Sequence, residues 1–119
     1  MNPEPVIAVV YSVPLVVEGL ADALRGFGKV RAFPAKGGDV AGLLESLRPA
    51  AVVVDREDEA LLGARYARGA GVPVLHINLR TRSLRLFRDG RWETEARLDT
   101  SPQAVRNLLV AAIYGASVA

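Results

Sequence analysis

The chain alternates short, continuous apolar runs with longer stretches in which apolar residues recur every three or four positions. The short runs are typical of buried strands and the periodic stretches of amphipathic helices. Strands are expected at 5–11, 29–35, 50–55 and 72–79, and helices after each of the first three strands and at 101–114. This alternation predicts a parallel sheet covered by helices on both faces.

Local signals refine this pattern. Ser12 can cap the first helix and Asp39 the second, because short polar side chains accept hydrogen bonds from the free N–H groups at a helix start. Gly26 and Pro49 are suited to end the same two helices. The strand at 29–35 is expected at an edge of the sheet, because its proline cannot donate to a neighbouring strand.

Residues 80–99 depart from the helical pattern. Apolar residues alternate there around an Asp89-Gly90 pair. An Asp-Gly pair between alternating segments is a strong signal for a two-residue hairpin turn. We therefore predict a β-hairpin in this stretch.

Composition narrows the function classes. The 119 residues form one domain (1–119) with a net charge of +2, no cysteine and one histidine. Disulfides, thiolate metal sites and multi-histidine sites are excluded, and we expect no cofactor and no metal. No apolar stretch resembles a signal peptide or a membrane span, so no membrane partner and a cytoplasmic location are expected.

Asp55 is the first candidate for chemistry. It ends the apolar run Ala50 to Val54. The carboxyl ends of parallel strands are where open α/β sheets bind their ligands. Asp55 is therefore expected at the edge of the sheet where a functional site would form.

Three segments resemble the receiver domains of LuxR-type two-component response regulators. VPLVVEGLADAL at 13–24 is similar to their HPLVREGLRALL stretch, and TSPQAVRNLLVAAIYGAS at 100–117 to their final helix. RPAAVVVD at 48–55 is similar to their third strand. The resemblance implies a flavodoxin-like, three-layer α/β fold with a mostly parallel five-stranded sheet. The predicted hairpin would shorten or replace the fourth helix of that fold.

The resemblance stops at the residues that carry receiver chemistry. Receivers hold magnesium with two acidic residues after the first strand, and use a hydroxyl residue and a lysine after later strands. Those positions fall here on Tyr11, Ser12, Asn78 and Leu98. Asp55 alone matches the set, which indicates a pseudo-receiver that has lost aspartyl phosphorylation.

Two interpretations of Asp55 remain. Asp55 can be a phosphoacceptor if Glu57 or Asp58 supplies substitute metal ligands. Alternatively, Asp55 caps the third helix, or lines a polar pocket with Tyr11, Ser12 and Asn78. We favour the second interpretation, because added phosphate would meet neighbouring acids and no lysine.

The predicted hairpin region is rich in arginine. Six arginines occur between residues 80 and 97, together with Phe87 and Trp92. Such a mixture can bind single-stranded nucleic acid. The favoured alternative is a solvated hairpin whose arginines pair with Asp89, Glu93 and Glu95 while Trp92 packs on the sheet. Direct nucleic-acid binding by this domain is therefore not expected.

The last helix suggests a homodimer. Its apolar residues occupy most of the helix circumference, whereas a helix packed on one sheet needs a single apolar stripe. The candidate interface residues are Val105, Leu108, Leu109 and Ala112. The alternative, weighed equally, is a helix whose small alanines tolerate exposure.

The sequence thus predicts a regulatory domain and not an enzyme. It would act through dimerisation or partner docking, as part of a transcriptional regulator. The resemblance implies a helix-turn-helix DNA-binding domain after it in the intact protein. Two alternatives remain: a small-molecule sensor that uses the pocket around Asp55, and a receiver that is still phosphorylatable.

Overall fold

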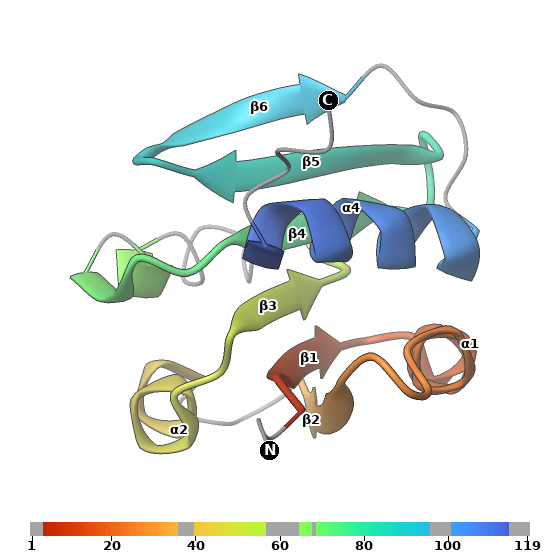
Figure 1. Ribbon diagram of the computed structural model, residues 1–119. Helices are drawn as coiled ribbons and strands as arrows, with labels where there is room; N and C mark the ends of the chain where they lie inside the picture. The colour runs from red at the N-terminus through yellow and green to blue at the C-terminus, as the bar shows by residue number, and fades with distance from the viewer. Residues whose placement is uncertain (1–3, 36–39, 57–64, 68, 96–100, 115–119) are drawn as a thin grey trace.

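The computed structural model describes residues 4–35, 40–56, 65–67, 69–95 and 101–114. Its strands form one six-stranded sheet in the order β2-β1-β3-β4-β5-β6 (Figure 1). The strands are β1 (Val6–Tyr11), β2 (Lys29–Pro34), β3 (Ala51–Val54), β4 (Val74–Asn78), β5 (Ser83–Arg88) and β6 (Arg91–Glu95). The helices are α1 (Pro14–Ala23), α2 (Val40–Leu47) and α4 (Pro102–Tyr114), and residues 65–67 and 69–70 are also helical.

The first four strands are parallel, as the sequence predicts. β1 lies between β2 and β3, and β3 pairs with β4. All four residues of β3 are buried, because helices cover both faces of this part of the sheet. β2 is at one edge and is largely exposed, which confirms the placement indicated by Pro34.

The expected fold class is wrong. The sheet has six strands rather than five, and it is mixed rather than mostly parallel. β5 runs antiparallel to β4, from Val74 opposite Phe87 to Asn78 opposite Ser83, and β6 runs antiparallel to β5. The described chain is therefore not a flavodoxin-like receiver fold.

The connection after β4 explains this difference. β4 ends at Asn78 and β5 begins at Ser83, so only Leu79 to Arg82 join them. A parallel return to the same sheet needs a crossover of about a dozen residues or more. A short connection permits only an antiparallel neighbour, and no fourth receiver helix fits between these strands.

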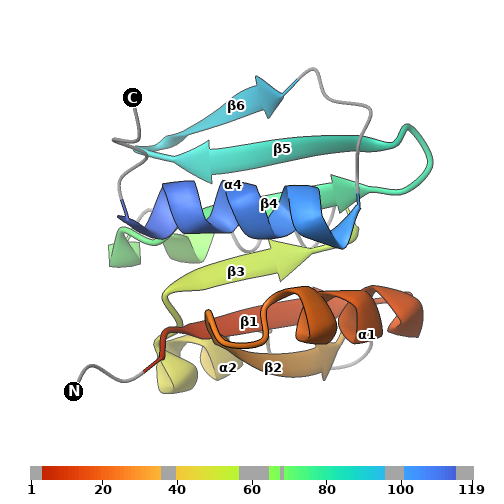
Figure 2. The same cartoon turned by 45° about the vertical axis from the view of Figure 1, so that its right-hand side comes forward.

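The hairpin predicted at Asp89-Gly90 is present between β5 and β6. Both turn residues have positive φ angles, 55° for Asp89 and 81° for Gly90. Positive φ at both positions defines the turn type whose twist matches that of antiparallel strands. The two strands extend the main sheet, as Figure 2 shows.

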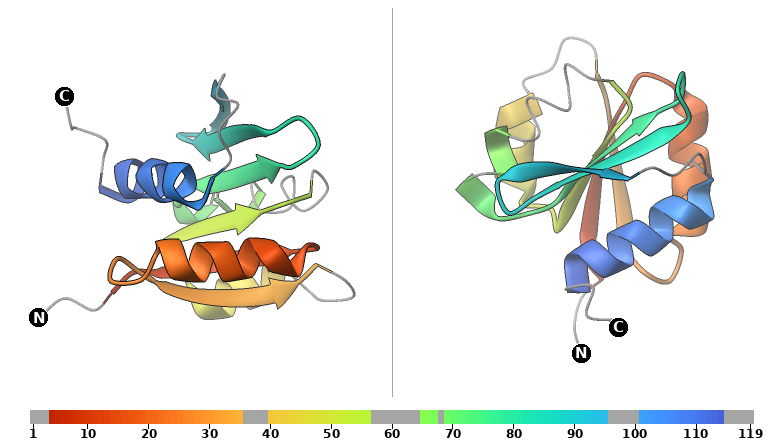
Figure 3. Two further views of the ribbon diagram at one scale, coloured as in Figure 1. Left: turned by 90° about the vertical axis from the view of Figure 1, so that its right-hand side faces the viewer. Right: turned by 90° about the horizontal axis from the view of Figure 1, so that it is seen from above.

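Two hydrophobic cores lie on opposite faces of the sheet (Figure 3). α1 and α4 cover one face, and α2 with the helical residues 65–67 and 69–70 covers the other. Alternate residues of one strand enter different cores: Ile7 and Val9 face α1 and α4, whereas Ala8 and Val10 face α2. The alternation explains why β1 reads as a continuous apolar run in the sequence.

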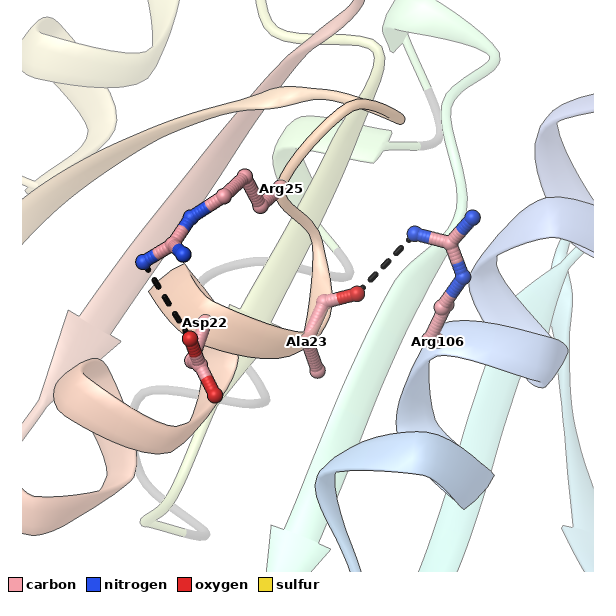
Figure 4. A network of polar contacts seen from close by, with 4 residues as sticks. All are labelled: Asp22, Ala23, Arg25 and Arg106. Carbon is pink, nitrogen blue, oxygen red and sulfur yellow. Dashed lines mark hydrogen bonds and ion pairs between the residues drawn. The ribbon is translucent and has the colours of Figure 1, made fainter.

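α1 and α4 approach each other closely on their shared face. A Cβ atom on Gly19 would lie 3.1 Å from Cγ of Pro102, so a glycine permits this approach. Nη1 of Arg106 donates a hydrogen bond to the carbonyl of Ala23, at 2.9 Å (Figure 4). This contact satisfies a carbonyl at the end of α1 that has no partner within its own helix. The Arg106 guanidinium also lies 5.5 Å from the centre of the Phe27 ring.

The turn between β5 and β6 yields a stability prediction. Gly90→Ala should lower the free energy of unfolding by about 1–2 kcal/mol, because an L-residue is strained at positive φ. Gly69→Ala is the matched control: neither position has a heavy atom within 4 Å of the added Cβ, and Gly69 is helical. It should cause no loss, because alanine favours a helix. Urea denaturation measures both, and equal losses would contradict the prediction.

Candidate functional site

The Asp55 carboxylate accepts several hydrogen bonds at the carboxyl end of the sheet. Its Oδ1 accepts hydrogen bonds from the backbone N–H and the hydroxyl of Ser12, at 2.8 and 3.0 Å. Its Oδ2 accepts from the backbone N–H groups of Ser12 and Val13, both at 3.0 Å. Both oxygens are therefore bound to the loop between β1 and α1.

The sheet order creates this contact. β1 and β3 are parallel neighbours, with Val10 opposite Val54, so the residues after both strands emerge at the same edge. The chain leaves β1 towards β2 and returns on the other side to β3, and such a reversal normally opens a ligand crevice. Asp55 spans that crevice and ties its two sides together.

Asp55 also supplies the negative charge and the hydrogen-bond acceptor that the start of α1 lacks. The cap residue is Val13, which has an extended backbone and no side-chain cap, and the first turn carries no acidic residue. A carboxylate at this end favourably complements the helix dipole. The prediction that Ser12 caps α1 is therefore wrong, because its hydroxyl donates to Asp55 instead. The prediction that Asp55 caps the third helix concerns residues 57–64, outside the described residues.

Asn78 has a comparable structural part in the next connection. Its Oδ1 accepts hydrogen bonds from the backbone N–H groups of Arg80 and Thr81, at 3.0 and 3.1 Å. An asparagine that binds the N–H groups two and three residues ahead stabilises a tight turn. Asn78 thus helps to fix the short connection that makes β5 antiparallel to β4.

A depression of about 580 Å³ lies beside these two side chains. Its lining residues are Val13, Asp55, Arg56, His76, Asn78, Leu79, Arg80 and Thr81. Of the predicted pocket residues, Asp55 and Asn78 line it. Tyr11 instead packs against the core under α1 and α4, and Ser12 contacts Asp55 without lining the depression.

Sequence reasoning missed Arg56, His76 and Arg80 as lining residues. His76 is 3% exposed and its ring lies 6.5 Å from that of Trp92. A signal for it was available: His76 is two residues before Asn78 in β4, so both side chains share one face of the sheet. The Leu98 position, which aligns with the receiver lysine, lies outside the described residues.

The predicted dimer residues of α4 differ in how deeply they are buried. Val105 and Leu109 are 1% and 0% exposed and belong to the core. Leu108 and Ala112 are partly buried against the same core. Much of the apolar surface of α4 is therefore used within the domain, because the helix packs against both the sheet and α1.

The arginine-rich hairpin has internal partners for two of its basic residues. Nε of Arg88 lies 3.1 Å from a carboxylate oxygen of Glu93. The Arg85 guanidinium lies 4.7 Å from the centre of the Trp92 ring, which also contacts Phe87 at 5.3 Å between ring centres. Of the expected pairs, the described residues show Arg88 with Glu93, and Trp92 packs on the core as expected. The absence of direct nucleic-acid binding stays a prediction.

Comparisons with known proteins give no relative: no family model, no curated protein and no solved structure matches the chain. No helix in the described residues is long and apolar enough to cross a membrane. Within those same residues, no group of three or more histidine, aspartate or glutamate side chains could hold a metal ion.

The bonding of Asp55 yields a second stability prediction. Asp55→Ala should lower the free energy of unfolding by about 2 kcal/mol, because three donors lose a charged acceptor. Ser12→Ala, which removes only the hydroxyl donor, should cost about 1 kcal/mol.

Asp22→Ala is the matched control for this prediction. The Asp22 side chain is 76% exposed and pairs only across one helical turn with Arg25, at 3.2 Å (Figure 4). Its loss should cost about 0.5 kcal/mol or less. Guanidinium denaturation of the three variants measures the differences, and an Asp55→Ala loss no larger than that of Asp22→Ala would show that the Asp55 contacts do not hold the fold.

Proposed function

We propose that this domain is a non-enzymatic regulatory module that works without aspartyl phosphorylation and acts by binding a partner. The observation that carries the proposal is the bonding of Asp55. Both of its carboxylate oxygens accept hydrogen bonds from the β1–α1 loop. A carboxylate in this arrangement acts as a structural hydrogen-bond acceptor.

Phosphorylation of Asp55 would be unfavourable for two further reasons. An aspartyl phosphate adds bulk and negative charge at an oxygen that now binds backbone N–H groups, so those hydrogen bonds would have to break. The transfer also needs a divalent cation to neutralise phosphoryl charge. Tyr11 and Ser12 offer no carboxylate for it, and Glu57 and Asp58, the suggested substitutes, lie outside the described residues.

The regulatory part of the proposal is supported by the three segments that resemble LuxR-type receivers. They support a cytoplasmic transcriptional regulator in which a helix-turn-helix domain follows this one. The six-stranded mixed sheet differs from the receiver fold beyond Asn78. The altered part is the half of the sheet in which receivers respond to phosphorylation, so its replacement fits a module with another input.

A small anionic ligand is the second candidate input. Two arginines, Arg56 and Arg80, and the imidazole of His76 line the depression beside Asp55. Among the described lining residues the one carboxylate, that of Asp55, is already bound to N–H and O–H donors, which reduces its repulsion of an anion. The lining is thus suited to a small molecule with a phosphate or carboxylate group.

A phosphorylation assay tests the main proposal. Incubation with acetyl phosphate and Mg²⁺ should leave the intact mass unchanged, because both Asp55 oxygens already accept hydrogen bonds and the described residues provide no metal site beside them. A phosphorylatable receiver treated in parallel controls for the reagent. A gain of one phosphoryl group that disappears in Asp55→Asn would refute the proposal.

Thermal denaturation with inorganic phosphate or citrate tests the second candidate. Either anion should raise the melting temperature of the wild type more than chloride at equal ionic strength does. Arg80→Gln should lose this increase. Arg25→Gln, which changes an arginine that is 80% exposed on the surface beside α1, should keep it. The ligand hypothesis fails if both variants respond as the wild type does.

A further inference from the structure

β6 forms an open edge of the sheet. It pairs with β5 on one side, and no strand among the described residues pairs with it on the other. The opposite edge, β2, carries exposed Lys29 and Arg31 and ends in Pro34, features that discourage further pairing. An open edge strand presents unpaired N–H and C=O groups that can bind another strand.

The hairpin turn determines which backbone groups of β6 are free. Arg88 and Arg91 flank the two-residue turn and therefore form a hydrogen-bonded pair. Hydrogen bonding alternates along an antiparallel strand, so Arg91 and Glu93 direct their backbone groups towards β5. Trp92, between them, directs its N–H and C=O away from β5, towards the open edge.

The charges on β6 are incompletely matched among the side chains that the structure describes. Arg88 and Arg91 are direct cross-strand neighbours of like charge, an unfavourable arrangement. Glu93 pairs with Arg88 at 3.1 Å. Arg91 is exposed, and its guanidinium makes no ion pair or hydrogen bond within the described residues. A carboxylate supplied from beyond the edge would compensate its charge.

We propose that β6 pairs with β6 of a second copy of this chain, antiparallel and with Trp92 on the two-fold axis. In this register Trp92 is opposite the partner's Trp92, and their outward backbone groups form the hydrogen bonds. Arg91 is then opposite the partner's Glu93, and Glu93 opposite the partner's Arg91. The edge is self-complementary, as a two-fold interface requires.

The alternative registers fit these residues less well. A shift by one residue would bring the outward groups of Trp92 against inward groups of the partner strand, so the hydrogen bonds could not form. A two-fold axis through Glu93 would bring two carboxylates together. In the proposed register the outward backbone groups of Trp92 form hydrogen bonds, and Arg91 and Glu93 each face an opposite charge.

The Trp92 side chain is already packed in a single copy of the domain. It is half-buried and rests against Phe87, with the Arg85 guanidinium over its ring, so its side chain is already ordered in one copy. Opposite residues in a sheet point to the same face, so the two tryptophan side chains would adjoin. This dimer is independent of the state of Asp55, which lies beyond β4 in the sheet.

Charge exchange tests the proposed register. Sedimentation equilibrium should show a reversible dimer for the wild type. Arg91→Glu should weaken it about tenfold or more, because both ion pairs become repulsions. The double variant R91E/E93R should restore dimerisation, because the exchanged charges again face each other. Arg31→Glu makes the same charge change on the β2 edge and should leave the dimer constant unchanged.

Two measurements distinguish this dimer from other outcomes. Trp92 is the only tryptophan, so its emission should change on dilution across the dimer constant. Its backbone amide should exchange hydrogen more slowly at high protein concentration. Thermal denaturation checks that each variant is folded. A wild type that is monomeric throughout, a dimer unaffected by Arg91→Glu, or one abolished by Leu108→Glu but not by Arg91→Glu would overturn the proposal.

Discussion

The hydrogen bonds from Ser12 and Val13 to the Asp55 carboxylate join the ends of the neighbouring strands β1 and β3, at the edge of the sheet where open α/β folds bind their ligands. Nothing in the backbone ladder of β1 and β3 extends that far, because their pairing ends at Val10 and Val54. The same contacts position the start of α1, which has no cap of its own. Asp55, at the end of β3, thus binds the residues that lead into α1, and α1 in turn packs against α4.

This constraint decides what the candidate site can do. The hydrogen bonds from backbone N–H groups to the Asp55 carboxylate stabilise the start of α1. Any reaction at the carboxylate oxygens must first break these hydrogen bonds. For this reason we propose binding beside Asp55 rather than chemistry on it. Arg56, His76 and Arg80 provide the lining for such binding, at the carboxyl ends of β3 and β4.

The short connection from Asn78 to Ser83 determines the second half of the sheet. By returning the chain antiparallel, it fills the region of a crossover helix with a hairpin and moves the sheet edge to β6. The new edge carries Arg91 and Glu93 on either side of Trp92, whose backbone groups face outward, and no described strand lies beyond it. We thus propose that this domain makes its regulatory contacts at the β6 edge. That edge exists because β5 and β6 follow β4 as an antiparallel hairpin.

The sequence by itself determined the elements with strong local signals: the buried strands β1 and β3, the edge position of β2, the helix α4 and the turn at Asp89-Gly90. These elements follow from the spacing of apolar residues, from the missing N–H group of proline and from the need for positive φ angles in the turn. Each of these signals acts over a few residues. Tertiary structure alone decided the sheet order beyond β4, the partner of Asp55 and the burial of Val105 and Leu109. Each of these depends on contacts between residues far apart in the chain, and their energies are not encoded in any short stretch of it.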